Sequence, residues 1–544
     1  MTEPATSPAE PATRLVRASA VVALGTLLSR ITGLVRVGVL AYALGQATLA
    51  DSYNLANSTP NIMYELVVGG VLTATLVPVF VDHLQRRDDR ATSAVFTVTL
   101  VVLAGLTVLA MLTAPLLARL YSIDASGAQR DAQLEVMTLL IRCFAPQIFF
   151  YGFTALAAAV LNARRRYAAA AYAPVLNNVV VVCVLLAFAR LAEGPQEGWV
   201  DVARIRDDQG LLLLLGLGTT AGIAAMALVL VPAVARTGAA LRPVFAWRHE
   251  AVRRVISLSG WTVGYVIANQ LALLFVLVLA ATGDAGDVSA YQYAFIFFQL
   301  PHGLFAVSIM TTVTPELARY ATAGDNAGLR REFSLGLRYL LLVVVPSAVG
   351  LAVLAQPAVA VLVRGAFDSA DAVITADVLQ ALAPALIGFS VYLFTLRGFY
   401  ALQDTRTPFL VNVFENGANI VLAVALYPAF GVQGLALAYA GAYTLAAVVA
   451  LALLYRRVGD VLGGAIATAG RAAVGSIALA IVAALLAGAI SRDSTTAAAT
   501  AVIVGGAAGV VVYLAVLRAL GTEELRDLWR ALPGRGRGTR PADV

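Results

Sequence analysis

The stretch SRITGLVRVGVLAYALGQATLADSYNLANSTPNIMYELVVGGVLTATLVPVF, residues 29–80, carries charged side chains inside sequence that is otherwise apolar enough to cross a bilayer. These side chains are Arg30, Arg36, Asp51 and Glu65. A charge at the centre of a membrane helix costs about 2.5–3.5 kcal/mol on insertion scales, so such residues usually face a protein interior or a wet cavity. Two arginines in the first predicted helix therefore indicate an anion-binding site between helices.

The composition of the whole chain is that of a membrane protein. Of its 544 residues, 60% are hydrophobic and 13% are charged, and the mean hydropathy is +0.83. Soluble domains contain about 25% charged residues. Runs of roughly 20 apolar residues recur along the chain, and each is long enough to span about 30 Å of hydrocarbon as a helix. We predict an all-α integral membrane protein.

Fourteen apolar segments are predicted, and the positive charges between them set the orientation. The segments are 16–44, 50–81, 92–120, 133–161, 168–190, 211–235, 252–281, 288–317, 333–363, 373–401, 408–428, 432–455, 472–490 and 498–520. With the N-terminus inside, 25 arginines fall in inner loops and 7 in outer ones. Because positive residues favour the cytoplasm, both termini are predicted to be cytoplasmic. The arginines occupy short loops, which explains the basic charge without a nucleic-acid partner.

An internal repeat divides the predicted helices into two lobes. At an offset of 241 residues, Gly45 matches Gly286, Pro60 matches Pro301, and Asn178 matches Asn419. Parallel repeats of this kind are related by an axis along the membrane normal. We predict two pseudo-symmetric six-helix lobes plus two extra C-terminal helices. The predicted divisions are a disordered tail 1–13, an N-lobe 14–247, a C-lobe 248–457, two further helices within 458–522, and a cytoplasmic tail 523–544.

The spacing of the two arginines raises a geometric question. Arg30 and Arg36 are six residues apart, so in a straight helix they point about 120° away from each other. They converge only if the helix bends or unwinds, and Gly33 between them is the predicted place. Together they would suit a pyrophosphate. Snorkelling to the cytoplasmic surface is the other interpretation for Arg30. Pro60 and Pro301 are the predicted hinges, although a proline can also be a static bend.

The two acidic residues of the stretch allow different interpretations. Asp51 is predicted near the outer end of the first hairpin, either as part of the substrate site or as the N-cap of the second helix. Glu65 lies deeper and could pair with Arg30 or Arg36 as a gate when no anion is bound.

In the C-lobe the corresponding polar residues are Arg397, Glu415, Asn416 and Asn419. Their spacing permits either a cation or proton coupling site or plain hydrogen bonding between helices. No catalytic constellation, cofactor or metal site is predicted, because the three histidines are scattered and no phosphate-binding loop occurs.

At this point the motifs resemble those of a known family. SRITGLVR at 29–36, PN at 60–61, VP at 77–78, LNARRRY at 161–167, QLPHGLFAVSI at 299–309, TPELAR at 314–319 and FYALQDTRTP at 399–408 resemble the MurJ (MviN) family. That family belongs to the multidrug/oligosaccharidyl-lipid/polysaccharide exporter superfamily. YQYAFIFFQLPHG at 291–303 is similar to its actinobacterial branch.

The resemblance implies a lipid II flippase of peptidoglycan synthesis in the bacterial cytoplasmic membrane. It implies fourteen helices, alternating access, a cationic cavity in which Arg30 and Arg36 hold pyrophosphate, membrane lipids as surroundings, and cell-wall synthesis proteins as partners. The chain departs from the family at Tyr64 and Glu65, where many members have an arginine pair, and at Phe295, Ile296 and Gln299, where many have charges. Alternatives are an exporter of another undecaprenyl-linked glycan, a non-transporting scaffold, and a membrane enzyme acting on lipid-linked phosphates.

Overall fold

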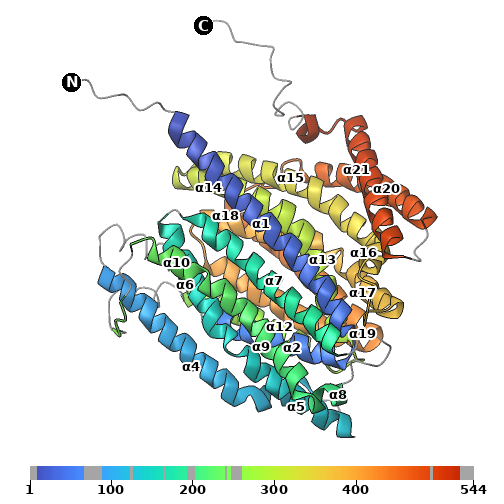
Figure 1. Ribbon diagram of the computed structural model, residues 1–544. Helices are drawn as coiled ribbons and strands as arrows, with labels where there is room; N and C mark the ends of the chain where they lie inside the picture. Colours follow the sequence, from blue (N-terminus) through green and yellow to red (C-terminus); the bar gives the residue numbers. More distant parts are fainter. Residues whose placement is uncertain are drawn as a thin grey trace, which may run out of the picture. The chain divides into compact units, whose positions relative to one another are not determined.

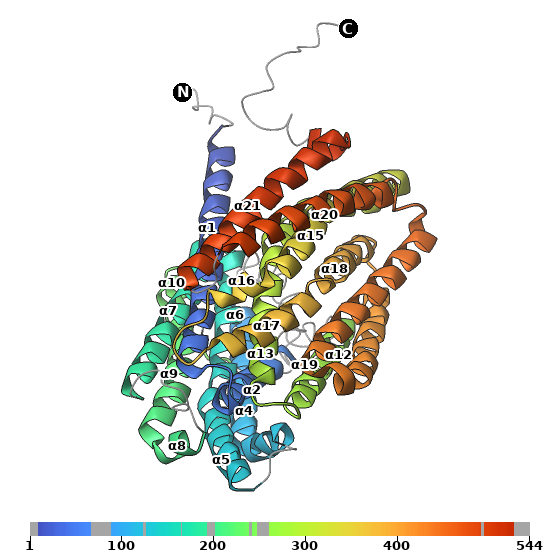
Figure 2. The same ribbon diagram turned by 90° about the vertical axis from the view of Figure 1, so that its right-hand side faces the viewer.

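The structure is a computed structural model, and it describes residues 9–66, 89–122, 127–164, 166–192, 202–238, 242–246, 260–490 and 494–526. Within these ranges all the named secondary-structure elements are helices, joined by turns and loops, and one isolated β-bridge joins Arg364 and Phe367 (Figures 1 and 2). The all-α prediction is confirmed. Eleven helices are long and apolar enough to cross a membrane, or twelve if one bent pair counts as a single span. The predicted count of fourteen stays a prediction.

The chain divides into two compact units, and two of the three boundaries fall inside helices, one in Asp287–Pro301 and one in Ser369–Leu382. Unit 1 comprises residues 1–292 and 364–371, and unit 2 comprises 293–363 and 372–544. The predicted lobe boundaries follow the sequence repeat rather than packing, and they stay a prediction. The helices of the first half are α1 (Ala9–Leu44), α2 (Thr48–Tyr64), α4 (Asp89–Tyr121), α5 (Gly127–Phe144), α6 (Gln147–Ala163), α7 (Tyr167–Leu191), α8 (Val202–Asp207), α9 (Gln209–Leu228), α10 (Leu230–Ala235), α12 (Gly260–Ala280) and α13 (Asp287–Pro301).

The helices of the second half follow directly from α13. They are the π-helix η2 (His302–Ala306), α14 (Val307–Thr322), α15 (Asn326–Val353), α16 (Ala355–Ala360), α17 (Ser369–Leu382), α18 (Ala385–Ala401), α19 (Arg406–Val458), α20 (Ala465–Ala489) and α21 (Thr495–Ala519). α17 and α18 form the bent pair, at 44°. α19 is helical on both sides of Gly431, whose φ of 55° and ψ of −139° interrupt it between the two predicted segments 408–428 and 432–455.

Helix α1 begins at Ala9, within the predicted tail 1–13, and residues 1–8 lie outside the described ranges, so the disordered tail stays a prediction. Proline is tolerated in the first turn of a helix, where its missing N–H would have no intrahelical partner. Pro11 occupies that turn, and the helix starts directly after Pro8. At the other end, residues 527–544 of the predicted cytoplasmic tail lie outside the described ranges.

Two pairs of repeat-related residues adopt matching backbone conformations. Gly45 and Gly286 have φ of 64° and 99°, a region that glycine enters without strain, and they precede α2 and α13. Pro60 and Pro301 are the second pair, and each lies in an α-helix that continues into a π-helical turn. The turn after Pro60 is at Glu65 and Leu66, and the turn after Pro301 is η2. Such turns are frequent at functional sites. The chain therefore repeats its turn and its helix irregularity as well as its sequence.

Small residues let helices in unit 2 pack closely. A Cβ added to Gly475 of α20 would lie 2.8 Å from Tyr513 Cδ2 of α21, and one added to Gly509 would lie 3.0 Å from Leu479 Cγ. The two helices run side by side in both views (Figures 1 and 2). Glycine at helix contacts is typical of membrane proteins, where packing replaces the hydrophobic effect between helices. The Tyr513 hydroxyl also donates to Leu342 O of α15 at 2.6 Å.

The turn between α18 and α19 is fixed by Asp404. Its carboxylate accepts hydrogen bonds from Thr407 N at 3.0 Å and Thr407 Oγ1 at 2.7 Å, and it pairs with Arg457 at the far end of α19. Burial raises the pKa of Asp404, but the Thr407 hydrogen bonds and the Arg457 charge outweigh it and hold that pKa below its usual range. This carboxylate, one residue before the N-cap Thr405, therefore binds the first turn of α19 and connects it to the last turn.

Candidate functional site

The two arginines of the first helix point to different sides. α1 is continuous α-helix from Ala9 to Leu44, so the unwinding predicted at Gly33 is not present in this structure. Six residues of straight helix separate two side chains by about 9 Å along the axis and about 120° around it. Arg30 is exposed and Arg36 is half-buried. A Cβ at Gly33 would have only Asn178 Nδ2, at 3.7 Å, in contact range.

Asn178 of α7 holds the segment that carries Arg30. Its amide Nδ2 donates to Ser29 O at 3.2 Å and to Thr32 Oγ1 at 3.0 Å. Asn178, the repeat partner of Asn419, thus connects α7 to the first helix. The guanidinium of Arg30 is left exposed on the other side of these contacts.

Arg36 lies beside a tyrosine wall built by α2 and α6. It is close enough to Tyr53 and Tyr151 to act electrostatically on both hydroxyls. Tyr53 OH is hydrogen-bonded to Thr219 Oγ1 at 3.0 Å, while Tyr151 is half-exposed and its ring centroid lies 5.6 Å from that of Tyr64. Tyrosine offers a flat apolar face together with a polar hydroxyl. The wall combines one cation with ring faces and hydroxyl groups.

α2 changes its environment along its length, which explains where this wall begins. Residues 49–56 are buried, whereas Asn57, Ser58, Asn61 and Tyr64 are half-exposed. Positions 57, 61 and 64 are spaced by four and three, so they share one helix face. Tyr151 also receives a hydrogen bond from the Asn61 side chain. The open face of α2 therefore meets Tyr151 of α6 and carries two amides and the Tyr64 ring.

Asp51 lies in the first turn of α2 and its carboxylate binds another helix. The N-cap of α2 is Ala47, so Asp51 does not cap its own helix. Its carboxylate instead accepts hydrogen bonds from Gly286 N at 2.7 Å, Ser289 N at 2.9 Å and Ser289 Oγ at 2.6 Å. Asn54 Nδ2 adds a bond to Ser289 Oγ at 3.0 Å. The side chain is 7% exposed and its oxygens bind the first turn of α13, so the geometry is that of a structural clamp.

Glu65 lies at the C-cap of α2 and is half-buried. Among the described residues no ion pair joins it to Arg30 or Arg36, so the predicted pairing is not formed in this structure. Residues 67–88, which follow it, lie outside the described ranges.

The polar residues of the C-lobe separate into two places. Glu415, Asn416 and Asn419 are buried together on α19, at 1%, 7% and 6% exposure. Glu415 Oε2 and Asn419 Oδ1 are buried without a hydrogen-bond donor in the described part of the chain, while Asn416 Nδ2 donates to Asn412 O at 2.9 Å. Arg397 is exposed near the end of α18, beside Tyr400, and forms no ion pair with Glu415. The three α19 residues therefore form one cluster without Arg397.

Aromatic residues occupy the region of unit 2 where the sequence lacks the family's charges. Phe295 packs on Phe298 and Tyr439 at centroid distances of 5.4 and 5.6 Å. Phe389 lies 4.9 Å from the Tyr443 ring and 4.6 Å from His302, which is hydrogen-bonded through Nδ1 to Ser390 Oγ at 2.9 Å. Phe295 therefore belongs to a packed cluster of aromatic rings.

Tyr53 and Tyr151 were not predicted as site residues, and Arg142 was not predicted as a charge within a span. The two tyrosines have no local signal, since only the packing of α2 against α6 and α9 brings them to Arg36. Arg142 is an exposed arginine in the last turn of α5, within the candidate span 130–163. Its signal was available, because it is a charge inside an apolar segment.

The family model described as "Lipid II flippase MurJ" matches residues 40–495. This chain belongs to the MurJ family. A probable lipid II flippase MurJ of Haemophilus influenzae is 31% identical over 447 residues, covering 79% of this chain and 84% of the relative. The lipid II flippase MurJ of Burkholderia cenocepacia is 30% identical over 432 residues, covering 78% of this chain and 80% of the relative.

Solved structures agree on the fold. A lipid II flippase MurJ in an inward closed conformation matches with a TM-score of 0.73 at 21% identity, covering 94% of this chain and 99% of that one. An inward-facing multidrug resistance MATE family transporter of the MOP superfamily matches with a TM-score of 0.62 at 14% identity, covering 79% and 95%. The chain is a multi-pass membrane protein with the MurJ fold.

Proposed function

We propose that this chain is a flippase that moves lipid II from the inner to the outer leaflet of the bacterial cytoplasmic membrane by alternating access. The observation that carries the proposal is the family match over residues 40–495 together with relatives of about the same length named lipid II flippase. The excess of arginine in the predicted inner loops supports cytoplasmic termini.

The substrate contact that we infer is centred on Arg36. Lipid II carries a pyrophosphate between its sugars and its polyprenyl tail, and a guanidinium binds phosphate oxygens in a planar fork. Arg36 has no carboxylate partner among the described residues and lies against Tyr53 and Tyr151. The ring faces and amides of the same wall suit a sugar. Arg30 and Arg36 precede the region matched by the family model, so their role rests on this geometry.

We assign Arg30 a contact with the substrate earlier in transport than that of Arg36. It is exposed and lies one and two-thirds turns closer to the predicted cytoplasmic end. Because the straight helix directs the two side chains apart, we infer that Arg30 meets the anionic headgroup on entry and that Arg36 holds it inside. Glu65 is assigned a gating role that requires a conformation different from this one. Asp51 is left out of the substrate site, since its carboxylate is occupied by α13.

We further propose that the α19 cluster couples transport to a proton or a cation. Glu415 and Asn419 bury oxygens that receive no donor from the described residues, and such oxygens attract a proton or a small cation. The π-helical turns after Pro60 and Pro301 are the proposed hinges. Interhelical hydrogen bonding remains the competing role for the cluster, and the coupling test in the Discussion separates the two.

Complementation tests the proposal. A host depleted of its own lipid II flippase receives the wild type, Arg36→Ala, Arg30→Ala or the control Arg164→Ala, which removes an exposed arginine at the C-cap of α6. Hydrogen bonds to charged groups contribute about 1.5–3 kcal/mol, so loss of Arg36 should slow flipping roughly 10–100-fold. The wild type and Arg164→Ala should restore growth at equal membrane abundance. Growth with both Arg30→Ala and Arg36→Ala would overturn the site, and no growth with an abundant wild type would overturn the function.

A further inference from the structure

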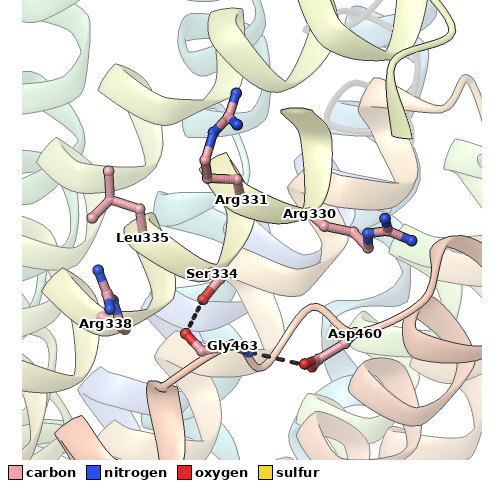
Figure 3. Close-up of a pocket in the computed structure, with 7 residues that line it drawn as sticks. All are labelled: Arg330, Arg331, Ser334, Leu335, Arg338, Asp460 and Gly463. Atoms are coloured by element: carbon pink, nitrogen blue, oxygen red, sulfur yellow. Dashed lines mark hydrogen bonds between the residues drawn. The ribbon is translucent and has the colours of Figure 1, made fainter. Parts of the chain in front are cut away.

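Unit 2 contains a second arginine-lined site, at the start of α15. A cavity of about 430 Å³ lies between the first turns of α15 and the loop joining α19 to α20 (Figure 3). Three arginines, Arg330, Arg331 and Arg338, line it together with Ser334, Asp460 and Gly463. None of these residues belongs to the proposed substrate site, which lies in unit 1.

Hydrogen bonds hold the loop against the helix and shape the cavity. Ser334 Oγ donates to Gly463 O at 2.6 Å, and Arg330 Nη1 donates to Val458 O at 3.0 Å. Asp460 Oδ1 accepts from Leu462 N at 2.9 Å and Gly463 N at 3.3 Å. Its carboxylate therefore stabilises the turn. In Figure 3, Arg330 and Arg338 lie on opposite sides of the Ser334–Gly463 hydrogen bond, and Arg331 projects away from the loop.

Two glycines of the α19–α20 loop lack a side chain where the loop passes the guanidinium groups of Arg330 and Arg338. Gly459 and Gly464 have φ of 94° and 81°, which favours glycine on backbone grounds alone. A Cβ at Gly459 would lie 2.6 Å from Arg330 Nη1, and one at Gly464 would lie 3.3 Å from Arg338 Nη1. The loop is thus built to pass close to both guanidinium groups.

The cavity wall carries more positive than negative charge. Arg338 Nε lies 3.0 Å from Glu524 Oε1, so its charge is balanced by a carboxylate that is 2% exposed. Arg331 is exposed and has no ion pair or hydrogen bond with any described residue. Arg330 donates only to a neutral carbonyl among its described contacts. Besides Arg338, the cavity lining thus contains two guanidinium groups and one carboxylate, Asp460, which already accepts two backbone N–H groups. An anion with several acceptor oxygens is the complementary ligand.

The position of the cavity along α15 indicates the source of that anion. The three arginines lie within the first 13 residues of a candidate span that runs from Asn326 to Val353, and the residues from Tyr339 onward carry no charge. On the neighbouring α20, Ile466 and Ile477 are 74% and 61% exposed, as expected of a face that meets lipid. The cavity therefore lies at headgroup depth beside an apolar surface. Basic pockets between membrane helices on the cytoplasmic side bind anionic headgroups.

We propose that Arg330 and Arg331 bind the phosphate headgroup of an anionic phospholipid of the inner leaflet, at a site separate from the transported substrate. The acyl chains lie along the apolar surface of α15 and α20. Arg338 borders the site and remains paired with Glu524. The lipid would stabilise the contact between α15 and the α19–α20 loop, and its binding does not depend on the flippase proposal.

Lipid titration of the full chain in neutral detergent tests this site. Phosphatidylglycerol, phosphatidylcholine of the same chain length, and inorganic phosphate are added separately, and binding is followed by native mass spectrometry and by the thermal unfolding midpoint. Wild-type protein should retain phosphatidylglycerol preferentially. One basic residue near an anionic lipid contributes about a fivefold change in affinity. Arg331→Gln should weaken binding by about that factor, and the double variant with Arg330→Gln by about 25-fold.

The control variant is Arg456→Gln, which removes an exposed arginine from the end of α19 without touching the cavity wall. It should bind phosphatidylglycerol like the wild type. If the double variant does not fold, Arg331→Gln carries the test alone, because its side chain has no described partner to lose. Equal binding by Arg331→Gln and the wild type would overturn the proposal. Equal midpoint shifts from inorganic phosphate and phosphatidylglycerol would overturn the lipid as the source.

Discussion

Replacement of Asp51 by alanine should destabilise the protein strongly, because its carboxylate connects α2 to the first turn of α13. The substitution removes three hydrogen bonds and leaves Gly286 N and Ser289 N without their acceptor in a buried site. Each hydrogen bond to a charged group contributes about 1.5–3 kcal/mol, and the alanine variant no longer buries a charge, which offsets part of the loss. We expect the free energy of unfolding to fall by about 3–5 kcal/mol.

Chemical unfolding in mixed micelles measures this effect, with Asp208→Ala as the matched control. Asp208 accepts a hydrogen bond from Leu211 N at 3.0 Å as the exposed N-cap of α9. Its loss should cost about 1 kcal/mol, as is usual for an exposed cap. The loss of unfolding free energy in Asp51→Asn should lie between those of Asp51→Ala and Asp208→Ala, since the asparagine keeps one acceptor oxygen. If Asp51→Ala were as stable as Asp208→Ala and yet inactive in transport, Asp51 would act on the substrate and the clamp would be refuted.

Three further predictions concern other parts of the chain. Gly286→Ala should cost about 1–3 kcal/mol more than Gly324→Ala in the same unfolding assay, because both have positive φ but only the former would place a Cβ 2.5 Å from a backbone oxygen. Asp404→Ala should cost about 1 kcal/mol at neutral pH. Since the folded pKa of Asp404 lies below its ordinary value near 3.8, the stabilisation is present above that value and disappears as pH falls through the folded pKa, which a pH series of unfolding curves measures. Glu415→Gln should abolish the dependence of flipping rate on pH or sodium without loss of stability, and an unchanged dependence would remove the coupling role.

The membrane fold could be predicted from the sequence because hydropathy and the positions of helix-breaking glycines are local signals. Predicted segments 408–428 and 432–455 bracket Gly431, the residue at which α19 departs from helical geometry. The offset between Gly45 and Gly286 correctly paired two turns with positive φ. Both signals can be read within a few residues, so they needed no knowledge of tertiary contacts.

The roles of individual charged residues could not be predicted in the same way. Asp51 finds its partners 235 and 238 residues away, and nothing near Asp51 indicates them. Gly33 can permit a bend but does not require one, and α1 is continuous helix there, where Asn178 of α7 donates to Ser29 and Thr32. Proximity of Arg36 to Tyr53 and Tyr151 likewise depends on helices packed from three parts of the chain. Sequence therefore identified the charged positions but not their neighbours.

The most direct test of the flippase proposal is reconstitution of the purified full chain with a fluorescent lipid II analogue in sealed liposomes. An impermeant quencher reports how much of the analogue can reach the outer leaflet, and a fluorescent phosphatidylcholine serves as the control lipid. The account predicts that the wild type makes all of the lipid II analogue accessible, that Arg36→Ala does so far more slowly, and that the control lipid stays partly protected. Protection of the analogue equal to that in protein-free liposomes, with correctly folded wild type present, would contradict it.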